Sequence, residues 1–412
     1  MTTKIGIESI NAYCGQASLD IKTLFAARDL DLTRFDNLMM QKKSVNLPCE
    51  DSVTSAVNAA KPILDPLSQS ERNQIALLIT ATETGLDFGK SLSTYIYPYL
   101  NLSKNCRLFE IKQACYGGTA ALQMAAAWVS SQPSSQVKAL IIATDAARAA
   151  ARKTYAEPSQ GTGAVAMLIS KNPEILILDN GATGYYGYEI MDTCRPEPDL
   201  ETGNPDLSLL SYLDCLDNCY RIYCEKVEDI NIQTTFNYFA FHTPFAGMVK
   251  GAHRQLLRKN GYTDAQFIEA DFQKRVAPSL VYCEQVGNIY SATVYLALCG
   301  IIDNTDFINP KRVGIFSYGS GCCAEFYSGI LQPIAKEKLG ILSIKQSLEN
   351  RYLLDMLAYE KIIDINQEWF FGVKNKNVDI TPFEEIYTRQ FANKGLLILD
   401  KIENYKRYYR WS

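Results

Sequence analysis

The chain alternates between short, fully apolar runs and longer segments in which apolar residues recur at helical spacing. The runs "IALLITATE" (residues 75–83) and "ALIIATDAA" (residues 139–147) each end in small polar residues and an acid. Continuous apolar runs are typical of strands buried on both faces, and therefore of a parallel sheet covered by helices. Between these two strands the pattern predicts a helix at about 88–100, a strand at about 107–111 and a helix after Cys115.

The remainder of the chain repeats this alternation. The pattern predicts strands at 163–170 and 174–179 that close the first half, then an amphipathic helix at 207–227 and a strand ending at His242. Helices at 246–261 and 287–302 follow, and "RVGIFSYGSGCCAEFYSGIL" (residues 312–331) predicts two strands around a glycine-serine turn. The predicted class is therefore α/β, with a first half at 1–170 and a second half at 171–412.

Composition narrows the class of protein. The 412 residues can bury two domain-sized cores, and a net charge of -4 provides no basic field for nucleic acid or for an anionic membrane. No run approaches the roughly 20 apolar residues that span a bilayer, and "MTTKIGIESI" lacks the pattern of a secretory signal. Twelve scattered cysteines without paired spacing favour free thiols, so a cytoplasmic location is expected.

Cys115 is the candidate nucleophile. It lies in "KQACYGGTAAL" (residues 112–122), between a predicted strand and a predicted helix. A helix N-terminus stabilises a thiolate, so the pKa of Cys115 is expected to fall, and Gly117 and Gly118 would let backbone approach a substrate closely. A buried structural thiol is the competing interpretation.

Candidates for proton transfer are few, because the chain has only two histidines. His242 ends an apolar strand, whereas His253 lies among Lys250, Arg254 and Arg258, which predict an exposed cationic face. Glu83 also ends an apolar strand, where ligands gather in α/β sheets, so it is a candidate general base. A structural histidine and a capping or solvated acid remain the alternatives.

Two further groups complete the list of candidates. The turn in "FSYGSG" (residues 316–321) could supply backbone amides to an oxyanion, or could be a tight hairpin. No histidine and no CxxC motif accompanies the remaining clustered cysteines, so they are interpreted as ordinary thiols and no metal site is expected: Cys215, Cys219, Cys224, Cys322 and Cys323.

Seven stretches, in order along the chain, resemble the hydroxymethylglutaryl-CoA synthase family of the thiolase superfamily. They are "TETGLDFGKS", "QACYGGTAAL", "EPSQGTGAVAMLIS", "LSLLSYLDCLDNCY", "FHTPFAGMVKGAH", "VGNIYSATVYLAL" and "RVGIFSYGSG". The resemblance implies a thiolase-like fold, in which two similar halves stack as five αβαβα layers, and a homodimer. It requires no cofactor besides the phosphopantetheine that carries the substrates.

The resemblance also implies residue roles. Cys115 accepts an acetyl group, Glu83 removes a proton from its methyl group, and His242 assists the ketone acceptor. The product is a 3-hydroxy-3-methylglutaryl thioester, released when water hydrolyses the cysteinyl thioester. Substrate-contacting positions of the family correspond here to Ser159, Ser208, Asn288 and Ser317, and the amide near Ser320 is a candidate oxyanion donor.

Two departures from the family bear on the acyl carrier. Members that use CoA have lysines five and nine residues after the histidine, where this chain has Gly247 and Gly251, and "MDTCRP" (residues 191–196) lacks their bulky aromatics. Both features resemble the branch that installs β-branches in polyketides, which takes acyl groups from a donor and an acceptor acyl carrier protein. Lys250, Arg254 and Arg258, or the tail "YKRYYRWS" (residues 405–412), could then contact the acidic carrier.

Two alternatives to this function are retained. One is a primary-metabolism synthase that condenses acetyl-CoA with acetoacetyl-CoA for the mevalonate pathway. The other is a non-catalytic protein that binds carriers, against which the presence of Glu83, Cys115 and His242 argues.

Overall fold

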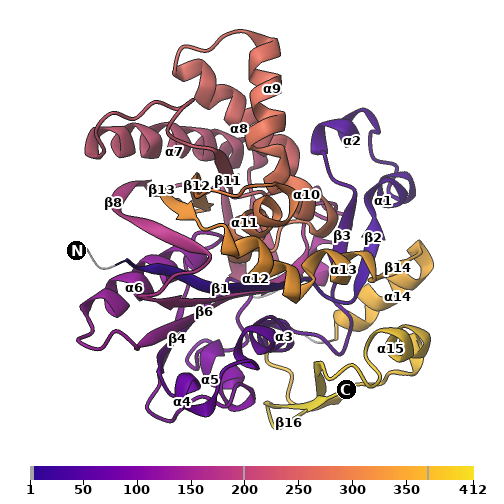
Figure 1. Ribbon diagram of the computed structural model, residues 1–412. Helices are drawn as coiled ribbons and strands as arrows, with labels where there is room; N and C mark the ends of the chain where they lie inside the picture. Colours follow the sequence, from indigo (N-terminus) through magenta and orange to yellow (C-terminus); the bar gives the residue numbers. More distant parts are fainter. Residues whose placement is uncertain (1–3, 198–199, 369–370) are drawn as a thin grey trace.

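A computed structural model describes residues 4–197, 200–368 and 371–412 (Figure 1). The sheet of the first half has the strand order β1-β7-β6-β4-β5, with bounds β1 Gly6–Tyr13, β4 Ile75–Ala81, β5 Arg107–Ile111, β6 Lys138–Ala146 and β7 Thr162–Ser170. β4 pairs in parallel with both β5 and β6, so their carboxyl ends meet at one edge. The two apolar runs are nearly fully buried, which confirms their interpretation as covered strands.

The sheet of the second half has the order β11-β12-β13-β8, with bounds β8 Leu176–Gly187, β11 Tyr238–Phe241, β12 Lys311–Gly319 and β13 Cys323–Leu331. β8 pairs with β13 over most of its length and meets β1 at two residue pairs. Leu176 and Ile177 pair with β1, as predicted for a strand at 174–179 that closes the first half, but the same strand also pairs with β13, so it links the strands of the two halves. Its longer continuation finds its hydrogen-bond partners in β13.

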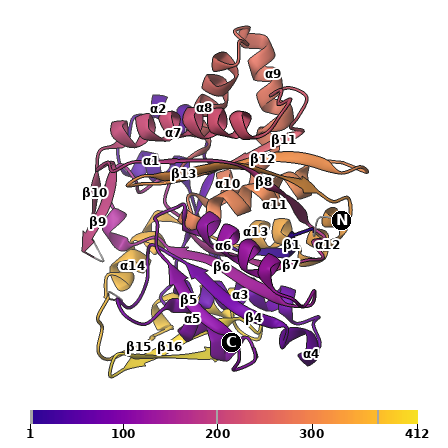
Figure 2. The same ribbon diagram turned by 90° about the vertical axis from the view of Figure 1, so that its left-hand side faces the viewer.

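Helices separate and cover the two sheets (Figure 2). α6 (Gly117–Ser131) and α11 (Thr293–Asn304) lie between the sheets, and their apolar residues belong to the central core cluster. α3 (Ser52–Leu64) covers the outer face of the first sheet, and α7 (Pro205–Lys226) covers that of the second. The predicted order of helix, sheet, helix, sheet and helix is confirmed.

Two helices are shorter than the pattern predicts. Instead of 88–100, α5 spans Leu92–Ile96 and a 3-10 turn spans Tyr97–Tyr99, where Pro98 removes a backbone donor. α11 begins at Thr293 rather than at 287, because the backbone of Asn288 is hydrogen-bonded to Ser159 and Gly161. A 3-10 turn, η3 (Tyr290–Ala292), connects the segment around Asn288 to α11.

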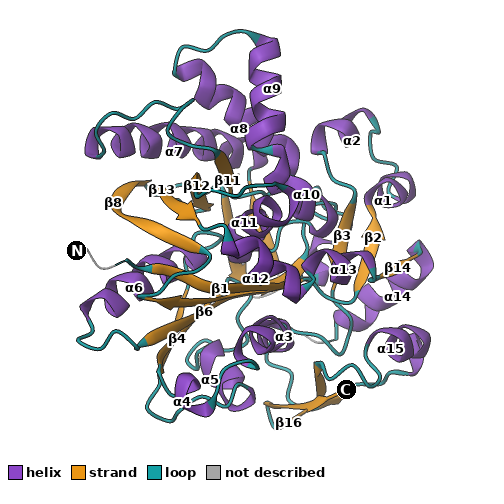
Figure 3. Ribbon diagram, in the orientation of Figure 1, coloured by secondary structure: helices purple, strands orange, loops and turns teal. Residues whose placement is uncertain are grey.

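The remaining elements surround this body (Figure 3). A small sheet, ordered β14-β2-β3, and a C-terminal sheet, ordered β15-β16-β17, flank the first half. Arg407 and Tyr409 of the C-terminal hairpin bond to Asp51, which caps α3. The bounds are β2 Ala17–Asp20, α1 Ile21–Ala27, α2 Thr33–Leu38, β3 Lys42–Val45, α4 Gln69–Arg72, β9 Thr193–Glu197, β10 Leu200–Gly203, α8 Ala246–Lys259, α9 Ala265–Arg275, α10 Ala277–Val286, α12 Ile334–Leu342, α13 Ile344–Glu349, β14 Tyr352–Leu354, α14 Met356–Asn366, β15 Lys376–Asn377, α15 Glu384–Gln390, β16 Leu397–Glu403 and β17 Lys406–Trp411.

Candidate active site

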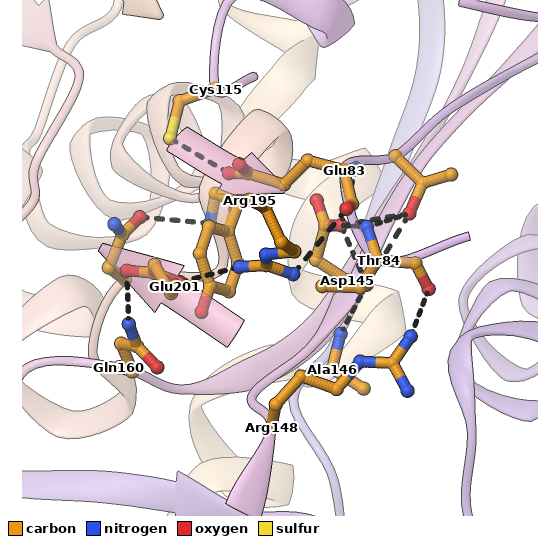
Figure 4. Close-up of polar contacts among 12 residues, drawn as sticks. Glu83, Thr84, Cys115, Asp145, Ala146, Arg148, Gln160, Arg195 and Glu201 are labelled. Atoms are coloured by element: carbon orange, nitrogen blue, oxygen red, sulfur yellow. Dashed lines mark hydrogen bonds and ion pairs between the residues drawn. The ribbon is translucent and has the colours of Figure 1, made fainter. Parts of the chain in front are cut away.

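Cys115 lies in the sharp turn between β5 and α6, and it is buried. The preceding residue, Ala114, has a φ of 44°, a left-handed conformation that costs a non-glycine residue about 1–2 kcal/mol. The Cys115 thiol donates a hydrogen bond to Glu83, with 3.3 Å between Sγ and Oε1, and the two side chains point toward each other (Figure 4). The strained turn therefore directs the thiol at the carboxyl end of β4.

Glycines at this turn allow segments of the chain to approach one another. A Cβ on Gly319 would lie 2.6 Å from both the carbonyl oxygen of Gln113 and the amide nitrogen of Tyr116. The end of β12 is therefore in contact with the turn that carries Cys115. A Cβ on Gly118 would lie 2.4 Å from the carbonyl oxygen of Ser291, so Gly118 serves close packing within the chain rather than approach by a substrate.

The expected lowering of the Cys115 pKa is wrong. Burial raises the pKa of the thiol well above its usual value, and the neighbouring Glu83 carboxyl raises it further. Cys115 also precedes α6 by two residues, so the benefit of the helix N-terminus is outweighed. The thiol therefore needs a base to become a nucleophile, and Glu83 is in hydrogen-bonding contact with it.

Glu83 follows β4 at the edge of the first sheet. Burial of its carboxyl, together with the negative charge of Asp145, raises its pKa to about 8, whereas Arg195 opposes the increase. A carboxyl group in this range can release and accept a proton near neutral pH. Neither capping nor solvation, the two competing interpretations, describes this environment.

Asp145, at the end of β6, was not predicted as a site residue. It is fully buried, and its Oδ1 accepts hydrogen bonds from the backbone amides of Glu83 (2.9 Å) and Thr84 (3.0 Å) and from the hydroxyl of Thr82 (2.8 Å). Its other oxygen, Oδ2, accepts from Ser291 at 3.0 Å. Asp145 thus fixes the backbone on which the Glu83 carboxyl is mounted. The signal was present in the sequence, because "IIATD" repeats the strand-end acid of "ITATE".

The hairpin of β9 and β10 supplies an ion pair near Glu83 that the sequence did not predict, formed by Arg195 and Glu201. Arg195 donates to the Glu83 carbonyl at 3.4 Å and to Glu201 Oε2 at 2.6 Å, and Gln160 donates to Glu201 Oε1 at 2.9 Å (Figure 4). The Arg195 guanidinium also lies over the Tyr290 ring. This ion pair connects the hairpin directly to Glu83.

His242 follows β11 and is buried, with its backbone nitrogen bonded to the Phe316 carbonyl at 2.7 Å. Burial lowers the pKa of His242 to about 3, so its imidazole is neutral. Its Nδ1 has no hydrogen-bond partner among the described residues. Because β11 and β12 are parallel neighbours, His242 lies at the sheet edge from which β12 continues to the Cys115 turn.

His253 is not on an exposed cationic face, which corrects the expectation from sequence. It is fully buried in α8, and Asp271 of α9 lies 2.7 Å from its Nε2. The adjacent residues Arg254 and Arg258 are exposed, because they lie on the opposite face of the same helix. Lys250 is half-buried and forms an ion pair with Glu269.

Two cavities lie beside the β9–β10 hairpin that contacts Glu83. A cavity of about 580 Å³ includes Ser159, Ser208, Pro244 and Met248 in its lining, together with Arg34 of α2. We call it the tunnel-side cavity, because two of the predicted substrate positions line it. The structure thus brings two of the predicted substrate positions together. A cavity of about 920 Å³, the base-side cavity, is lined in part by Glu83, Ala114, Arg195 and the predicted Ser320.

The remaining predicted positions lie within the protein framework. Asn288 donates its backbone amide to the Ser159 carbonyl at 2.6 Å, and its side chain accepts from Tyr290 and Thr293. Ser317 is buried in β12, and its hydroxyl has no hydrogen-bond partner among the described residues. Lys250, Arg254 and Arg258 are absent from the described linings of both cavities.

Each of the twelve cysteines is a free thiol, and Cys215 and Cys322 have their sulfurs 3.7 Å apart. In the parts of the chain that the structure describes, no group of three or more histidine, cysteine, aspartate or glutamate residues is arranged to hold a metal ion. Within the same residues, no helix combines the length and apolar character needed to cross a bilayer.

Comparison with known proteins places this geometry in a family. The family model for the N-terminal part of hydroxymethylglutaryl-coenzyme A synthase matches residues 2–174, and the model for the C-terminal part matches residues 176–270 and 257–411. The polyketide biosynthesis 3-hydroxy-3-methylglutaryl-ACP synthase PksG of Bacillus subtilis is 50% identical over 415 residues, which cover 98% of this chain and 99% of PksG.

Solved structures agree with the sequence matches. The HMG synthase of the curacin biosynthetic pathway, in complex with acetyl donor-ACP, superposes with a TM-score of 0.97 at 51% identity, covering 99% of this chain and 100% of that chain. MvaS in complex with 3-hydroxy-3-methylglutaryl coenzyme A gives a TM-score of 0.87 at 28% identity, with full coverage of both chains. The fold is thiolase-like, as predicted, and the chain belongs to the hydroxymethylglutaryl-coenzyme A synthase family.

Proposed function

We propose that this enzyme is a 3-hydroxy-3-methylglutaryl synthase of polyketide biosynthesis, which condenses an acetyl group with the β-ketone of an acyl chain on an acyl carrier protein. The observation that carries this proposal is the contact between the buried Cys115 thiol and the Glu83 carboxyl, in a chain that is half identical to PksG. A buried nucleophile beside a carboxyl group of raised pKa suits acyl transfer followed by proton abstraction.

The first step is acetyl transfer to Cys115. The thiol loses its proton to Glu83, and the sulfur attacks the carbonyl carbon of the acetyl thioester. The bond from that carbon to the pantetheine sulfur breaks, and the departing thiolate takes up the proton. Acetyl-Cys115 remains, and Glu83 is again a carboxylate. Backbone amides at Cys115 and near Ser320 are proposed to stabilise the oxyanion.

The second step forms the carbon–carbon bond. Glu83 removes a proton from the acetyl methyl group, and the enolate carbon attacks the ketone carbon of the β-ketoacyl thioester. Neutral His242 donates a hydrogen bond to the ketone oxygen, whose negative charge is then neutralised by the proton that Glu83 holds. Water next hydrolyses the Cys115 thioester, which yields the carboxylate of the product and restores the thiol. The balance therefore requires two thioesters and one water, and no redox partner.

The tunnel-side cavity supports delivery by a pantetheine arm. Ser159 and Ser208 provide hydroxyl groups for its amides, and Pro244 and Met248 provide apolar surface. The two positions that are lysines in CoA-using members are glycines here, and Gly247 packs so closely on α2 that a Cβ would lie 1.8 Å from the Asn37 carbonyl oxygen. Without these cations, recognition of nucleotide phosphates is weakened, which favours a protein-bound arm.

The carrier proteins are proposed to dock where α2 and α8 meet at the tunnel-side cavity. Arg34 lines this cavity, and Arg254 and Arg258 are exposed on α8. Acidic carrier surfaces complement these cations, which would steer association. Lys250 contributes less, because its ammonium group is already paired with Glu269.

Intact mass spectrometry tests the proposal. The enzyme is incubated with acetyl-loaded donor carrier protein and, separately, with acetyl-CoA at the same concentration. We expect a gain of one acetyl group from the carrier protein, absent in Cys115→Ala, and slower acylation by acetyl-CoA. Acylation by acetyl-CoA that equals or exceeds acylation by the carrier protein would favour the primary-metabolism alternative. Binding of the carrier without any adduct would favour the non-catalytic one.

The proposal also concerns the oligomeric state, the location in the cell and the division of the chain into two halves. The homodimer stays a prediction, which light scattering of the purified protein tests. Twelve free thiols fit the reducing cytoplasm in which such biosynthesis would take place. The division of the chain near residue 171 also stays a prediction.

A further inference from the structure

The base-side cavity is larger than the reaction of small thioesters requires. Its lining includes Glu83, Ala114 next to the nucleophile, and Ser320 on the β12–β13 turn, so the cavity reaches the candidate base and the residue that precedes the nucleophile. Its volume of about 920 Å³ lies within the range of sites that hold whole drug-sized ligands, about 300–1,000 Å³. The methyl group of an acetoacetyl acceptor would occupy a small part of it.

The hairpin of β9 and β10 separates this cavity from the tunnel-side cavity. Thr193 and Glu201 of the hairpin are the described residues that line both. Ser159 and Ser208 line one side, and Glu83 and Ala114 line the other. The two cavities therefore meet at the hairpin, with Glu83 on the base side and the predicted substrate positions on the other, and a pantetheine arm needs only one of the cavities.

The order of groups along the acceptor indicates what the base-side cavity would hold. A β-ketoacyl thioester has its ketone between the thioester carbonyl and the remainder of the acyl chain. When the arm occupies the tunnel-side cavity and the ketone lies at Cys115 and His242, the chain beyond the ketone continues away from the arm. The base-side cavity lies across the hairpin from the tunnel-side cavity and includes Glu83 in its lining, so it provides space for that part of the chain.

We infer that the base-side cavity is a chamber for the acyl chain of the acceptor beyond its ketone; this inference rests on the proposed function. Its walls combine apolar and polar groups. Leu108 and the contacting rings of Phe88 and Phe371 are apolar, whereas Lys90 and Glu110 are charged. The chamber therefore suits a long β-ketoacyl chain that carries oxygen substituents as well as hydrocarbon.

Substitutions at Thr94 test the chamber. Thr94 lies on α5 and lines the cavity, and its hydroxyl bonds to the Ser91 carbonyl. Thr94→Trp and Thr94→Ala both lose this hydrogen bond, but only the tryptophan fills the space. The acceptors are 3-oxobutanoyl-pantetheine and 3-oxodecanoyl-pantetheine, each offered to pre-acetylated enzyme.

We expect Thr94→Trp to reduce kcat/KM for the long acceptor by about tenfold or more, while the short acceptor changes by about threefold or less. Thr94→Ala, which leaves the space open, should reduce kcat/KM for the long acceptor far less than Thr94→Trp does. Equal losses for both acceptors, or no loss for either, would overturn the proposal that the base-side cavity holds the acyl chain. If the wild-type enzyme condenses neither acceptor, the proposed function itself fails, so the two failures are distinguishable.

Photolabelling of the wild-type enzyme provides a second test that requires no variant to fold. A 3-oxodecanoyl-pantetheine with a diazirine at the chain end is irradiated on the wild-type enzyme without an acetyl donor, so that the probe binds but is not condensed. Adducts within residues 85–94 or 108–114 support the chamber. Adducts confined to residues 25–38 or 244–248, on the tunnel side, contradict it.

Discussion

The thiol of Cys115 and the carboxyl group of Glu83 form a direct hydrogen bond, with 3.3 Å between Sγ and Oε1. The two residues are separated by 32 positions in the chain, and they meet because β4 and β5 are parallel neighbours that end at the same edge. Glu83 is thus in contact with the atom that would carry the acetyl group. One carboxylate can therefore serve both the thiol and the acetyl methyl group, in successive steps.

Replacing Glu83 by glutamine should separate these two steps. Glu83→Gln keeps the size of the side chain but removes the base, so condensation should fall by about 10²–10⁴-fold. Acetylation of Cys115 should fall by about tenfold only, since a base from the solvent can also take the proton of the thiol. Intact mass measures the acetyl adduct, and product formation from pre-acetylated enzyme measures condensation. Equal losses in the two steps would contradict a separate role in proton abstraction.

The pH dependence of condensation should report the Glu83 carboxyl. Its pKa is raised to about 8 by burial and by Asp145, and only the ionised form is a base, so the rate should rise with pH through this range.

The two charged neighbours of Glu83 should shift this rise in opposite directions. Arg195 lowers the pKa of Glu83, so Arg195→Gln should move the rising limb to higher pH, whereas Arg195→Lys should leave it in place. Glu201, the acidic partner of Arg195, has the opposite effect, so Glu201→Gln should move the limb to lower pH. Rates from pre-acetylated enzyme across pH measure these shifts. A limb that stays fixed in all variants would show that another group is titrating.

The two histidines should have separable effects. His242→Ala should reduce condensation by about 10²–10³-fold, because a hydrogen bond to the developing oxyanion is lost. His253→Ala should leave the rate per folded molecule unchanged but lower the free energy of unfolding by about 2 kcal/mol, because the hydrogen bond to Asp271 and buried packing are lost. Denaturant unfolding and condensation assays on both variants check this. A large loss of activity in folded His253→Ala protein would contradict the assignment.

The parts of the site that could be predicted are those placed by strand ends. Glu83 and His242 each follow a clear apolar run, and Cys115 precedes a clear helix, so the pattern alone placed each of them at the end of a strand or the start of a helix. The exposure of His253 and the pKa of Cys115 could not be predicted, because both depend on elements distant in sequence: α9 covers the first, and Glu83 faces the second. Arg195 and Glu201 were missed because their short hairpin has no apolar periodicity, and it reaches the site only through tertiary contacts.

The glycines of α8 provide the sharpest test of carrier preference. A Cβ on Gly251 would meet no described atom within 4 Å, so Gly251→Lys should fit and should stabilise the helix by about 0.5–1 kcal/mol. Gly247→Lys instead must displace α2, because a Cβ there would lie 1.8 Å from the Asn37 carbonyl oxygen, and overpacking of this kind costs about 1–3 kcal/mol. If lost phosphate contacts explain the preference for a protein-bound arm, Gly251→Lys should lower the KM for acetyl-CoA several-fold while acylation by the carrier protein stays constant. Gly251→Gln, which is long but uncharged, is the matched control and should not lower that KM. A decrease that is equal in both variants would mean that side-chain bulk, rather than charge, had been missing at this position.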